Sequence, residues 1–345
     1  MDGDGSFLHG VSPFPRVIGF LHNHIVYHNR CSLSTKFCIF LDKKENQGYN
    51  NHSFINDRIS FREVFFSLKT LGYYNGTFGE LHEMQVPMLD RATYFGDGVY
   101  DATYSRNHKI FALEEHIDRF YRSAEALGIH IGETKEALAA LLSDLVKKVE
   151  DGEQFVYFQA TRGTGLRDHA ASFEKANLWI MLKPCRVRDT YAPIRVITME
   201  DKRYLYCHIK TINLLPSVLY AQAAAEKGCD EAILHRGGVV TECAHSNVSI
   251  LSDGVLRTAP LNEYILPGTA RAHLLDKCRT FGIPVLEKAF TIDEMMVADE
   301  IIVTSAGSFC VPVSHVDGIP VGGKAPMLLK RLQDALLVDF LTATE

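Results

Sequence analysis

The order of strand-like and helix-periodic segments constrains this chain more than any other feature of its sequence. A strand–turn signal comes first, at residues 72–76. Apolar residues then recur at helical spacing over 113–127, and Gly128 is placed to cap that helix. A second helix is predicted over 134–152, where Thr134 supplies an N-terminal cap. Strands and helices mixed in this order predict an α+β fold.

Strand-like runs at 155–160 and 178–182 follow these helices, so residues 72–185 predict an α+β unit built on an antiparallel sheet. A polar connection ending at Pro193 separates this unit from a new apolar run at 194–199. We therefore expect two domains. The predicted partition is an atypical leader at 1–68, an N-terminal α+β domain at 69–187, a linker at 188–193 and a C-terminal domain at 194–345.

The C-terminal domain is expected to alternate helices with tight turns, because apolar periodic runs are punctuated there by glycine pairs and Asp-Gly. The predicted elements are helices at 214–227, 269–281 and 325–342, hairpins at 236–238 and 252–254, and a capping box at 291–294.

The leader at 1–68 differs from the rest of the chain, with frequent Asn, His and Ser and poor periodicity. Two explanations stay open: an upstream-extended start, with the true chain beginning near Leu68, or a genuine appended segment. A cluster of histidines and a cysteine in the leader does not match any familiar spacing of metal ligands, so no metal site is predicted. The cluster consists of His22, His24, His28 and Cys31.

Composition excludes several classes of protein. With 345 residues, 23% charged residues and a net charge of −6, the chain has no basic field suited to nucleic acid. Its eight cysteines form no CxxC pair, which indicates reduced thiols rather than a zinc or disulfide framework. No signal peptide and no apolar stretch of about 18 residues is present, so we expect a cytoplasmic protein with no membrane partner.

Lys210 is a candidate nucleophile, since it stands at the end of a strand-like stretch and just before a mostly apolar helix. Burial lowers the pKa of a lysine and frees its amine to attack an aldehyde. A lysine at a helix start with its ammonium group in solvent explains the same pattern. Glu242, after the predicted hairpin, is either a carboxylate that holds a pyridine nitrogen protonated or an exposed turn residue.

Three further features could bind anions. Arg119 lies on the first helix, where its guanidinium either points inward at a phosphate or pairs with Glu115. The loop 161–169 carries arginines and a histidine, which suit a carboxylate but also fit a solvated basic loop. Residues 267–269 precede a helix whose free N–H groups form an anion site. Residues 96–98 match no nucleotide-binding motif.

Taken together, these residues resemble the fold-type IV, or class IV, aminotransferases, and among them those acting on D-amino acids. The resemblance extends in order over about residues 72–340. It implies a two-domain fold whose larger C-terminal domain has a β-barrel-like core. The runs that carry it are FGDGVY (95–100), EHIDR (115–119), YFQATRG (157–163), IKTINLL (209–215), EKGCDEAILHR (226–236) and LPGTAR (266–271).

The resemblance also implies roles for single residues. In this family the lysine matching Lys210 forms a Schiff base with pyridoxal 5′-phosphate and moves the proton of the substrate, and the glutamate matching Glu242 pairs with the pyridine nitrogen. The cofactor phosphate is bound by the positions matching Arg119, Thr269 and Ala270. The substrate α-carboxylate is bound, in enzymes acting on D-amino acids, by the residues matching Tyr100, Arg167 and His169.

One departure from the family pattern lies in the late loop at 305–309. A threonine that contacts the phosphate is replaced here by Ala306. Ser305 or Ser308 could take over the missing bond. Loss of one charge-assisted hydrogen bond, about 1.5–3 kcal/mol, lowers affinity roughly ten- to a hundred-fold.

The predicted function is therefore transfer of the amino group of a D-amino acid such as D-alanine to a 2-oxo acid such as 2-oxoglutarate, by a ping-pong mechanism in a homodimer. Two other activities on the same scaffold stay open, a branched-chain L-aminotransferase and a 4-amino-4-deoxychorismate lyase. A catalytically silent protein that binds pyridoxal phosphate is the alternative of a different class.

Overall fold

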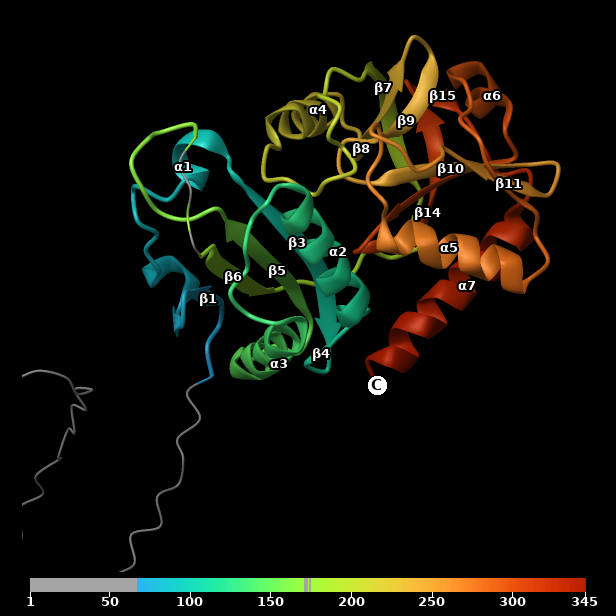
Figure 1. Ribbon diagram of the computed structural model, residues 1–345. Helices are drawn as coiled ribbons and strands as arrows, with labels where there is room; N and C mark the ends of the chain where they lie inside the picture. The colour runs from blue at the N-terminus through green and yellow to red at the C-terminus, as the bar shows by residue number, and fades with distance from the viewer. Residues whose placement is uncertain (1–66, 171–172, 174) are drawn as a thin grey trace, which may run out of the picture. The chain divides into compact units, whose positions relative to one another are not determined.

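The computed structural model of the chain describes residues 67–170, 173 and 175–345 (Figure 1). All of these fall within one compact unit, Arg62–Glu345. The predicted leader, with its His22–Cys31 cluster, lies outside the described residues except for its last two positions. Within the described part, no group of His, Cys, Asp or Glu is arranged to hold a metal ion, and no helix is long and apolar enough to cross a membrane.

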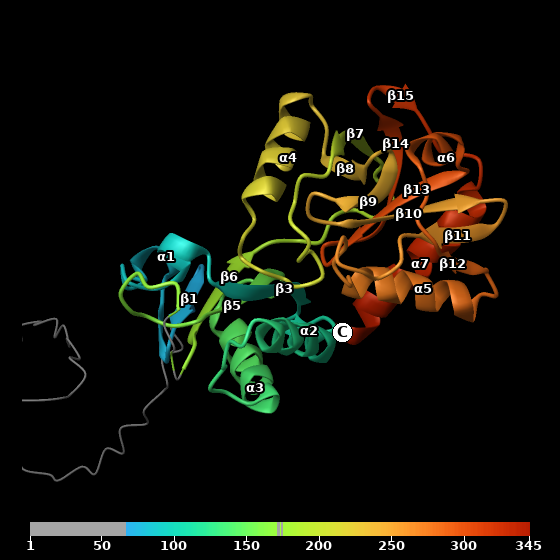
Figure 2. The ribbon, with the colours of Figure 1, turned by 45° about the horizontal axis from the view of Figure 1, so that its top comes forward.

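The first sheet is antiparallel throughout, as the sequence predicts, and its strands run in the order β2-β1-β6-β5-β3-β4. Two helices, α2 (Leu113–Ala126) and α3 (Lys135–Leu145), lie on one side of it (Figure 2). The strands are β1 (Leu71–Tyr74), β2 (Thr77–Gly79), β3 (Gly98–Arg106), β4 (Lys109–Ile110), β5 (Gln154–Thr161) and β6 (Asn177–Pro184).

Buried and more exposed residues alternate along the strands, which gives this sheet one buried face. In β5, every second residue is buried, and Phe158 meets Phe120 of α2 edge to face with ring centroids 5.0 Å apart. Both phenylalanines are fully buried in a core shared by the sheet, α2 and α3. This packing holds α2 against β3, which decides where the polar side chains of both elements meet.

The second predicted helix is shorter than expected. Thr134 caps α3 by accepting a hydrogen bond from the Ala137 N–H, as predicted, but the α-helix ends at Leu145. The chain then tightens into a 3₁₀ turn, Val146–Lys148, and becomes extended at Val149. The apolar pattern continues through this change because the turn still buries Val146 and Val149, so periodicity alone does not mark the end of the helix.

The second sheet is larger and mixed, and it curls into a half-barrel. Its main path runs β12-β11-β10-β13-β14-β7-β8-β9, with β15 paired to β14, and parallel pairs join β7 to β8, β14 to β7 and β11 to β12. The strands are β7 (Ile194–Glu200), β8 (Glu231–Arg236), β9 (Val239–Cys243), β10 (Asn247–Ser252), β11 (Val255–Thr258), β12 (Val285–Glu287), β13 (Glu300–Ser305), β14 (Ser308–Val316) and β15 (Ile319–Pro320).

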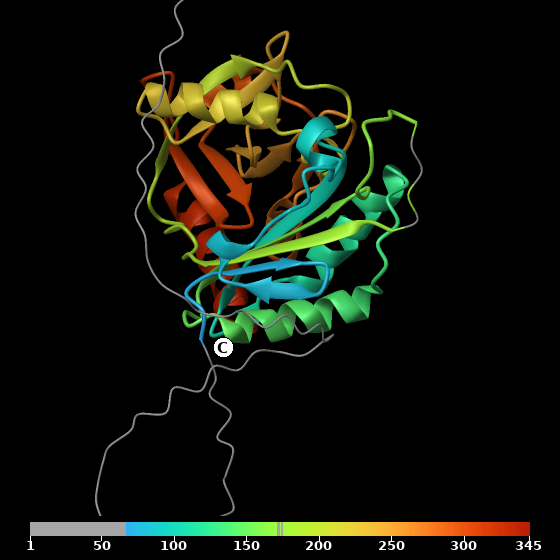
Figure 3. The ribbon, with the colours of Figure 1, turned by 90° about the vertical axis from the view of Figure 1, so that its left-hand side faces the viewer.

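The helices of this half follow the sequence predictions closely. The capping box is present at Thr291 and Glu294, and Gly228 ends the helix before β8 with a positive φ of 65°. In Figure 3, α4 (gold) runs above the first sheet (cyan to yellow-green), and α3 lies below it. The helices are α4 (Leu215–Glu226), α5 (Thr269–Thr280), α6 (Ile292–Val297) and α7 (Pro326–Ala343), besides the short α1 (Ala92–Phe95).

The predicted α+β fold with a larger, barrel-like C-terminal half is thus confirmed. The strands of the first sheet end at Pro184 and those of the second begin at Ile194. The domain bounds drawn between them, with a linker at 188–193, stay a prediction.

Candidate active site

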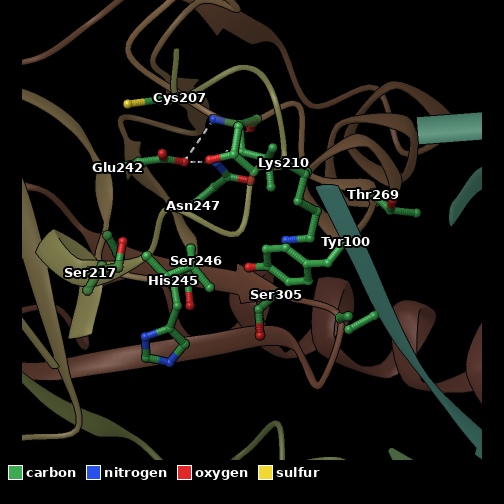
Figure 4. A pocket seen from close by; sticks show the side chains of 18 of the residues that line it. Tyr100, Cys207, Lys210, Ser217, Glu242, His245, Ser246, Asn247, Thr269 and Ser305 are labelled. Carbon is green, nitrogen blue, oxygen red and sulfur yellow. Dashed lines mark hydrogen bonds between the residues drawn. The ribbon is translucent and has the colours of Figure 1, made fainter. Parts of the chain in front are cut away.

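A cavity of about 470 Å³ opens beside β3, where elements of both sheets converge (Figure 4). Its walls come from β3, the segment 203–218, the turn after β9, the start of α5 and the turn between β13 and β14. Segments far apart in sequence therefore supply one site. The predicted site residues that line it are Tyr100, Arg119, Lys210, Glu242, Thr269, Ala270 and Ser305.

Lys210 reaches this cavity because its backbone is paired with β3. The Tyr100 N–H donates to the Lys210 carbonyl at 2.9 Å, and the Ile212 N–H donates to the Gly98 carbonyl at 3.1 Å. On the other side, the Lys210 N–H donates to the Ser123 hydroxyl of α2 at 3.2 Å. The segment thus continues the sheet beyond β3, and Lys210 is partly buried and lines the cavity ahead of α4, which begins only at Leu215.

Tyr100 lies directly beside this lysine. Lys210 Nζ is 4.3 Å from the centroid of the Tyr100 ring, which in turn stacks on Tyr157 with centroids 5.3 Å apart. An ammonium over an aromatic face is stabilised by the ring quadrupole. The stacked tyrosines form a rigid wall that limits where the amine can point.

Glu242 is buried, with 5% of its surface exposed, and every donor around it favours the carboxylate. Arg203 Nη1 donates to Oε1 at 2.5 Å. Asn247 Nδ2 and the Leu266 N–H donate to Oε2 at 2.8 and 3.0 Å. The alternative of an exposed turn glutamate is therefore wrong.

Burial raises the pKa of Glu242 to about 7, while Arg203 acts in the opposite direction. Arg203 is itself held by Asp201, to which Nε donates at 3.0 Å. A carboxyl group with a pKa close to neutrality can share a proton with a weakly basic nitrogen placed beside it.

Arg119 is buried as well, and it pairs with Asp101 of β3 rather than with Glu115. Its Nε and Nη2 donate to the two carboxylate oxygens of Asp101 at 2.8 and 2.7 Å. The imidazole Nδ1 of His116 lies 2.7 Å from the same carboxylate. Burial raises the pKa of Asp101, but Arg119 and His116 together bring it well below its ordinary value. Asp101 is therefore ionised, and Arg119 Nη1 stays near the cavity, 3.3 Å from the Pro267 carbonyl.

The N-terminus of α5 gives this side of the cavity further donors. Thr269 and Ala270 begin the helix, so their N–H groups have no intrahelical partner. Gly268 precedes them, and a Cβ there would lie 2.0 Å from Asn247 Oδ1. A Cβ at Gly307, in the facing turn, would lie 2.6 Å from the Tyr104 ring. Both glycines thus allow the backbone to approach the Asn247 and Tyr104 side chains in the cavity wall.

Comparison with known proteins places this geometry in a family. The sequence model described as Amino-transferase class IV matches residues 98–316. D-alanine aminotransferase of Listeria innocua is 37% identical over 271 residues, which are 76% of this chain and 94% of that protein. The enzyme of the same name from Bacillus licheniformis is 36% identical over 275 residues, 79% of this chain and 97% of that protein. The chain belongs to the class IV aminotransferases.

Solved structures support the same fold for this aminotransferase. The branched-chain aminotransferase of Thermoproteus uzoniensis, with norvaline, aligns with a TM-score of 0.74 at 24% identity, over 80% of this chain and 96% of that one. The branched-chain amino acid aminotransferase of Escherichia coli gives 0.71 at 23% identity, over 80% and 96%. Class IV aminotransferases are pyridoxal phosphate enzymes.

The cavity of this aminotransferase fits such a cofactor. Arg119, the start of α5 and Ser305 line it with anion-binding donors, and Glu242 and Lys210 supply a carboxylate and an amine. The hydroxyl of Thr304 is buried in the cavity wall and has no hydrogen-bond partner among the described residues. A buried hydroxyl without a partner is costly in an empty site, so its presence here favours a polar ligand.

Arg167 and His169 are the two predicted site residues that do not line this cavity. Both pack on Phe95 at the end of α1. The Arg167 guanidinium carbon lies 5.0 Å from the Phe95 ring centroid, and the His169 and Phe95 centroids are 4.8 Å apart. Both side chains are exposed, so the structure leaves them free to meet another molecule.

Arg203, Asp101 and His116 are site residues that the sequence did not reveal. Their partners are remote in the chain, since Arg203 is 39 positions from Glu242 and Asp101 is 18 positions from Arg119. The only local signal is an acidic residue, Asp101, at a buried position of β3, in the same alternation as the buried Val99 and Thr103.

The buried pair of Asp101 and Arg119 gives a prediction for stability. Asp101→Asn leaves the Arg119 charge uncompensated, so we expect the free energy of unfolding at neutral pH to fall by about 3–5 kcal/mol. Because the pKa of Asp101 is depressed on folding, this stabilisation is present above the ordinary aspartate pKa and is lost as the pH falls towards the folded value. Denaturant unfolding across this pH range measures both effects.

Asp118→Asn is the matched control. Asp118 pairs with Lys135 at 2.6 Å on the surface of the same helix, and its side chain is half exposed. A pair of this kind contributes at most about 1 kcal/mol. Equal losses of unfolding free energy in the two variants would show that the buried Asp101–Arg119 pair stabilises the fold no more than a surface pair.

Proposed function

We propose that this class IV aminotransferase moves the amino group of a D-amino acid, of the D-alanine type, to a 2-oxo acid, of the 2-oxoglutarate type. The observation that carries the chemistry is the placement of Lys210 and Glu242 in one cavity beside a set of anion-binding donors. The names of the relatives, D-alanine aminotransferases at 36–37% identity, carry the choice of substrate.

In this proposal each residue has a role set by its place in the cavity. Arg119, Thr269, Ala270 and Ser305 hold the phosphate of pyridoxal 5′-phosphate, and Glu242 keeps its ring nitrogen protonated. The cofactor supplies an aldehyde that bonds the amino group and a ring that draws electrons away from the substrate Cα. Lys210 is the acid and base of the site: Nζ removes the proton from Cα of the bound amino acid.

Arg203 supports Glu242 in this scheme. By donating to Oε1 it opposes the effect of burial on the pKa of Glu242 and keeps the second oxygen, Oε2, oriented by Asn247. Tyr100 and its partner Tyr157 limit the movement of the Lys210 amine. The amine is therefore held close to the position from which it removes the Cα proton.

The direct test is a substrate panel. We expect the enzyme to form D-glutamate from D-alanine and 2-oxoglutarate, measured by chiral chromatography, and to leave L-leucine unused. Lys210→Ala should reduce this activity at least about a thousandfold, because both acid–base catalysis and nucleophilic activation are lost. Borohydride reduction should fix the cofactor on the peptide that contains Lys210.

Lys227→Ala provides the control, since Lys227 is exposed at the end of α4 and does not line the cavity. Activity with L-leucine alone would favour the branched-chain alternative, and release of pyruvate from 4-amino-4-deoxychorismate would favour the lyase. Cofactor fixed on Lys210 without turnover of any substrate would favour the silent binding protein.

A homodimer is part of the proposal. The cavity is flanked by apolar side chains on the segment 204–206 and on the start of α4, and the Tyr204 hydroxyl donates to the Asn213 carbonyl to join the two. A monomer seldom exposes so many large apolar residues together. This apolar surface consists of Tyr204, Leu205, Tyr206, Leu214, Leu215, Val218 and Leu219.

Dimerisation also gives a role to Arg167 and His169. Both are exposed outside the cavity of their own chain, so we propose that they bind the substrate α-carboxylate in the cavity of the partner subunit. In a two-fold dimer each loop reaches the other chain in the same way. Leu166 of this loop is also 78% exposed, as expected of a residue that is covered on assembly.

Mixed dimers test this arrangement. We expect Lys210→Ala and Arg167→Ala homodimers to be nearly inactive, and co-refolded mixtures to regain about a quarter of the wild-type rate, because half of the dimers then hold one intact site. Mixing Lys210→Ala with Lys210→Ala,Arg167→Ala chains is the control and should restore nothing. Failure of the first mixture to regain activity, with dimers shown by light scattering, would place the loop outside the site of the partner.

Ala306 gives a prediction about the cofactor. It lies in the β13–β14 turn and lines the cavity between Ser305 and Gly307. Ala306→Thr should add a hydroxyl to the phosphate site and tighten binding roughly ten- to a hundred-fold, as one charge-assisted hydrogen bond does. Cofactor titration of the apoenzyme measures this, with Ala306→Val as the control of equal shape. Equal affinities for the two variants would contradict the phosphate contact.

We also propose a cytoplasmic location. Its support is the set of free thiols in the described residues, three of them buried, which form no disulfide: Cys185, Cys207, Cys229, Cys243, Cys278 and Cys310.

A further inference from the structure

A histidine in the cavity wall is not used by the proposed chemistry. His245 lies in the turn between β9 and β10, where it lines the cavity that contains Lys210, and its side chain is 61% exposed. In the view of Figure 4, His245 and Thr269 lie on opposite sides of Lys210. His245 is thus remote from the donors at the start of α5.

The imidazole is held by a buried carboxylate. His245 Nδ1 is 3.0 Å from Glu231 Oε2, and the Glu231 side chain is only 3% exposed. The Ser246 hydroxyl donates to the same oxygen at 2.9 Å, and the Ala232 N–H donates to Oε1 at 2.9 Å. Glu231 is therefore fixed beside Nδ1, while Nε2 has no hydrogen-bond partner among the described residues.

The charge of this histidine favours an anion. The hydrogen bond to Glu231 raises the pKa of His245, and Lys210 acts in the opposite direction. The two arginines that line the cavity are already paired, Arg119 with Asp101 and Arg203 with Glu242. In the proposed function, Lys210 serves the cofactor and the substrate Cα. A protonated Nε2–H is then a donor available to a further acidic group.

A second donor lies at the same end of the cavity. Ser217 is in the first turn of α4, and its hydroxyl has no hydrogen-bond partner in the part of the chain that the structure describes. The N-terminus of a 12-residue helix also favours negative charge. The cavity therefore has anion-binding groups at two ends, with Lys210 between them.

We propose that His245 is a specificity-determining residue that binds a second carboxylate, on the side chain of a dicarboxylic amino acid or 2-oxo acid. This inference rests on the proposed function, which assigns the donors at α5 to the cofactor phosphate. His245 strengthens the binding of acidic substrates such as glutamate and 2-oxoglutarate relative to alanine and pyruvate, which bind without this contact. Ser217 adds a neutral donor to the same carboxylate.

The test compares two donors in the holoenzyme. With 2-oxobutyrate as the common acceptor, kcat/KM is measured for D-glutamate and for D-alanine in the wild type and in His245→Gln, which keeps the size of the side chain but cannot carry its charge. The ratio of D-glutamate to D-alanine should fall at least about tenfold, mostly through KM, as expected for one charge-assisted hydrogen bond. His82→Gln, an exposed histidine outside the cavity, should leave the ratio unchanged.

Binding of unreactive acids separates this inference from the proposed function. Calorimetry should show that the holoenzyme prefers glutarate to butyrate, and that His245→Gln loses this preference. If that result came with no amino transfer, the proposed function would fail and the subsite would stand. The inference would be overturned if His245→Gln changed neither quantity by more than twofold. These quantities are the ratio of kcat/KM for D-glutamate to that for D-alanine, and the preference for glutarate over butyrate.

Discussion

The pairing of residues 210–212 with β3 is the contact on which the site depends. Lys210 belongs to the segment between β7 and α4, and this pairing places it at the edge of the first sheet. Hydrogen bonds from the Tyr100 N–H and to the Ser123 hydroxyl hold its backbone on two sides. The pairing needs a close approach at Gly98, since a Cβ there would lie 3.0 Å from the Ile212 side chain, besides 2.7 Å from the Ala160 carbonyl oxygen of β5. The amine is thus positioned by backbone hydrogen bonds, which do not change with side-chain substitutions in the cavity.

The second constraint is that each buried carboxylate of the site is paired with an arginine. Asp101 and Glu242 are both nearly removed from solvent, and each is bound to an arginine that also lines the cavity. A buried carboxylate without such a partner would be neutralised or would destabilise the fold. Each pair therefore stabilises the protein and also keeps a charge at the cavity, so the polar groups needed for chemistry are part of the structural core rather than additions to it.

Periodicity along the sequence locates most of the helices and three strands of the antiparallel sheet, β1, β5 and β6, because burial on one face follows a period of two or of about 3.6 residues. It does not mark β3 as a strand. It could not end α3 correctly, since Val146 and Val149 stay buried after the helix tightens. It also could not decide between Glu115 and a ligand as the partner of Arg119. The true partner, Asp101, comes from the packing of α2 on β3, which no local spacing encodes. The resemblance to a family identified Glu242 but not Arg203, which holds it.

The two ends of the cavity differ in how much they depend on side chains. At the start of α5 the donors are mainly backbone N–H groups, so Ala270, and even Ala306 in the facing turn, leave most of an anion site intact. At the other end, His245 and Ser217 act through their side chains alone. Both sit where substitution does not disturb a strand, in a turn and in a first helical turn. We therefore expect substitutions there to change the preference among substrates more than the binding of an anion at the start of α5.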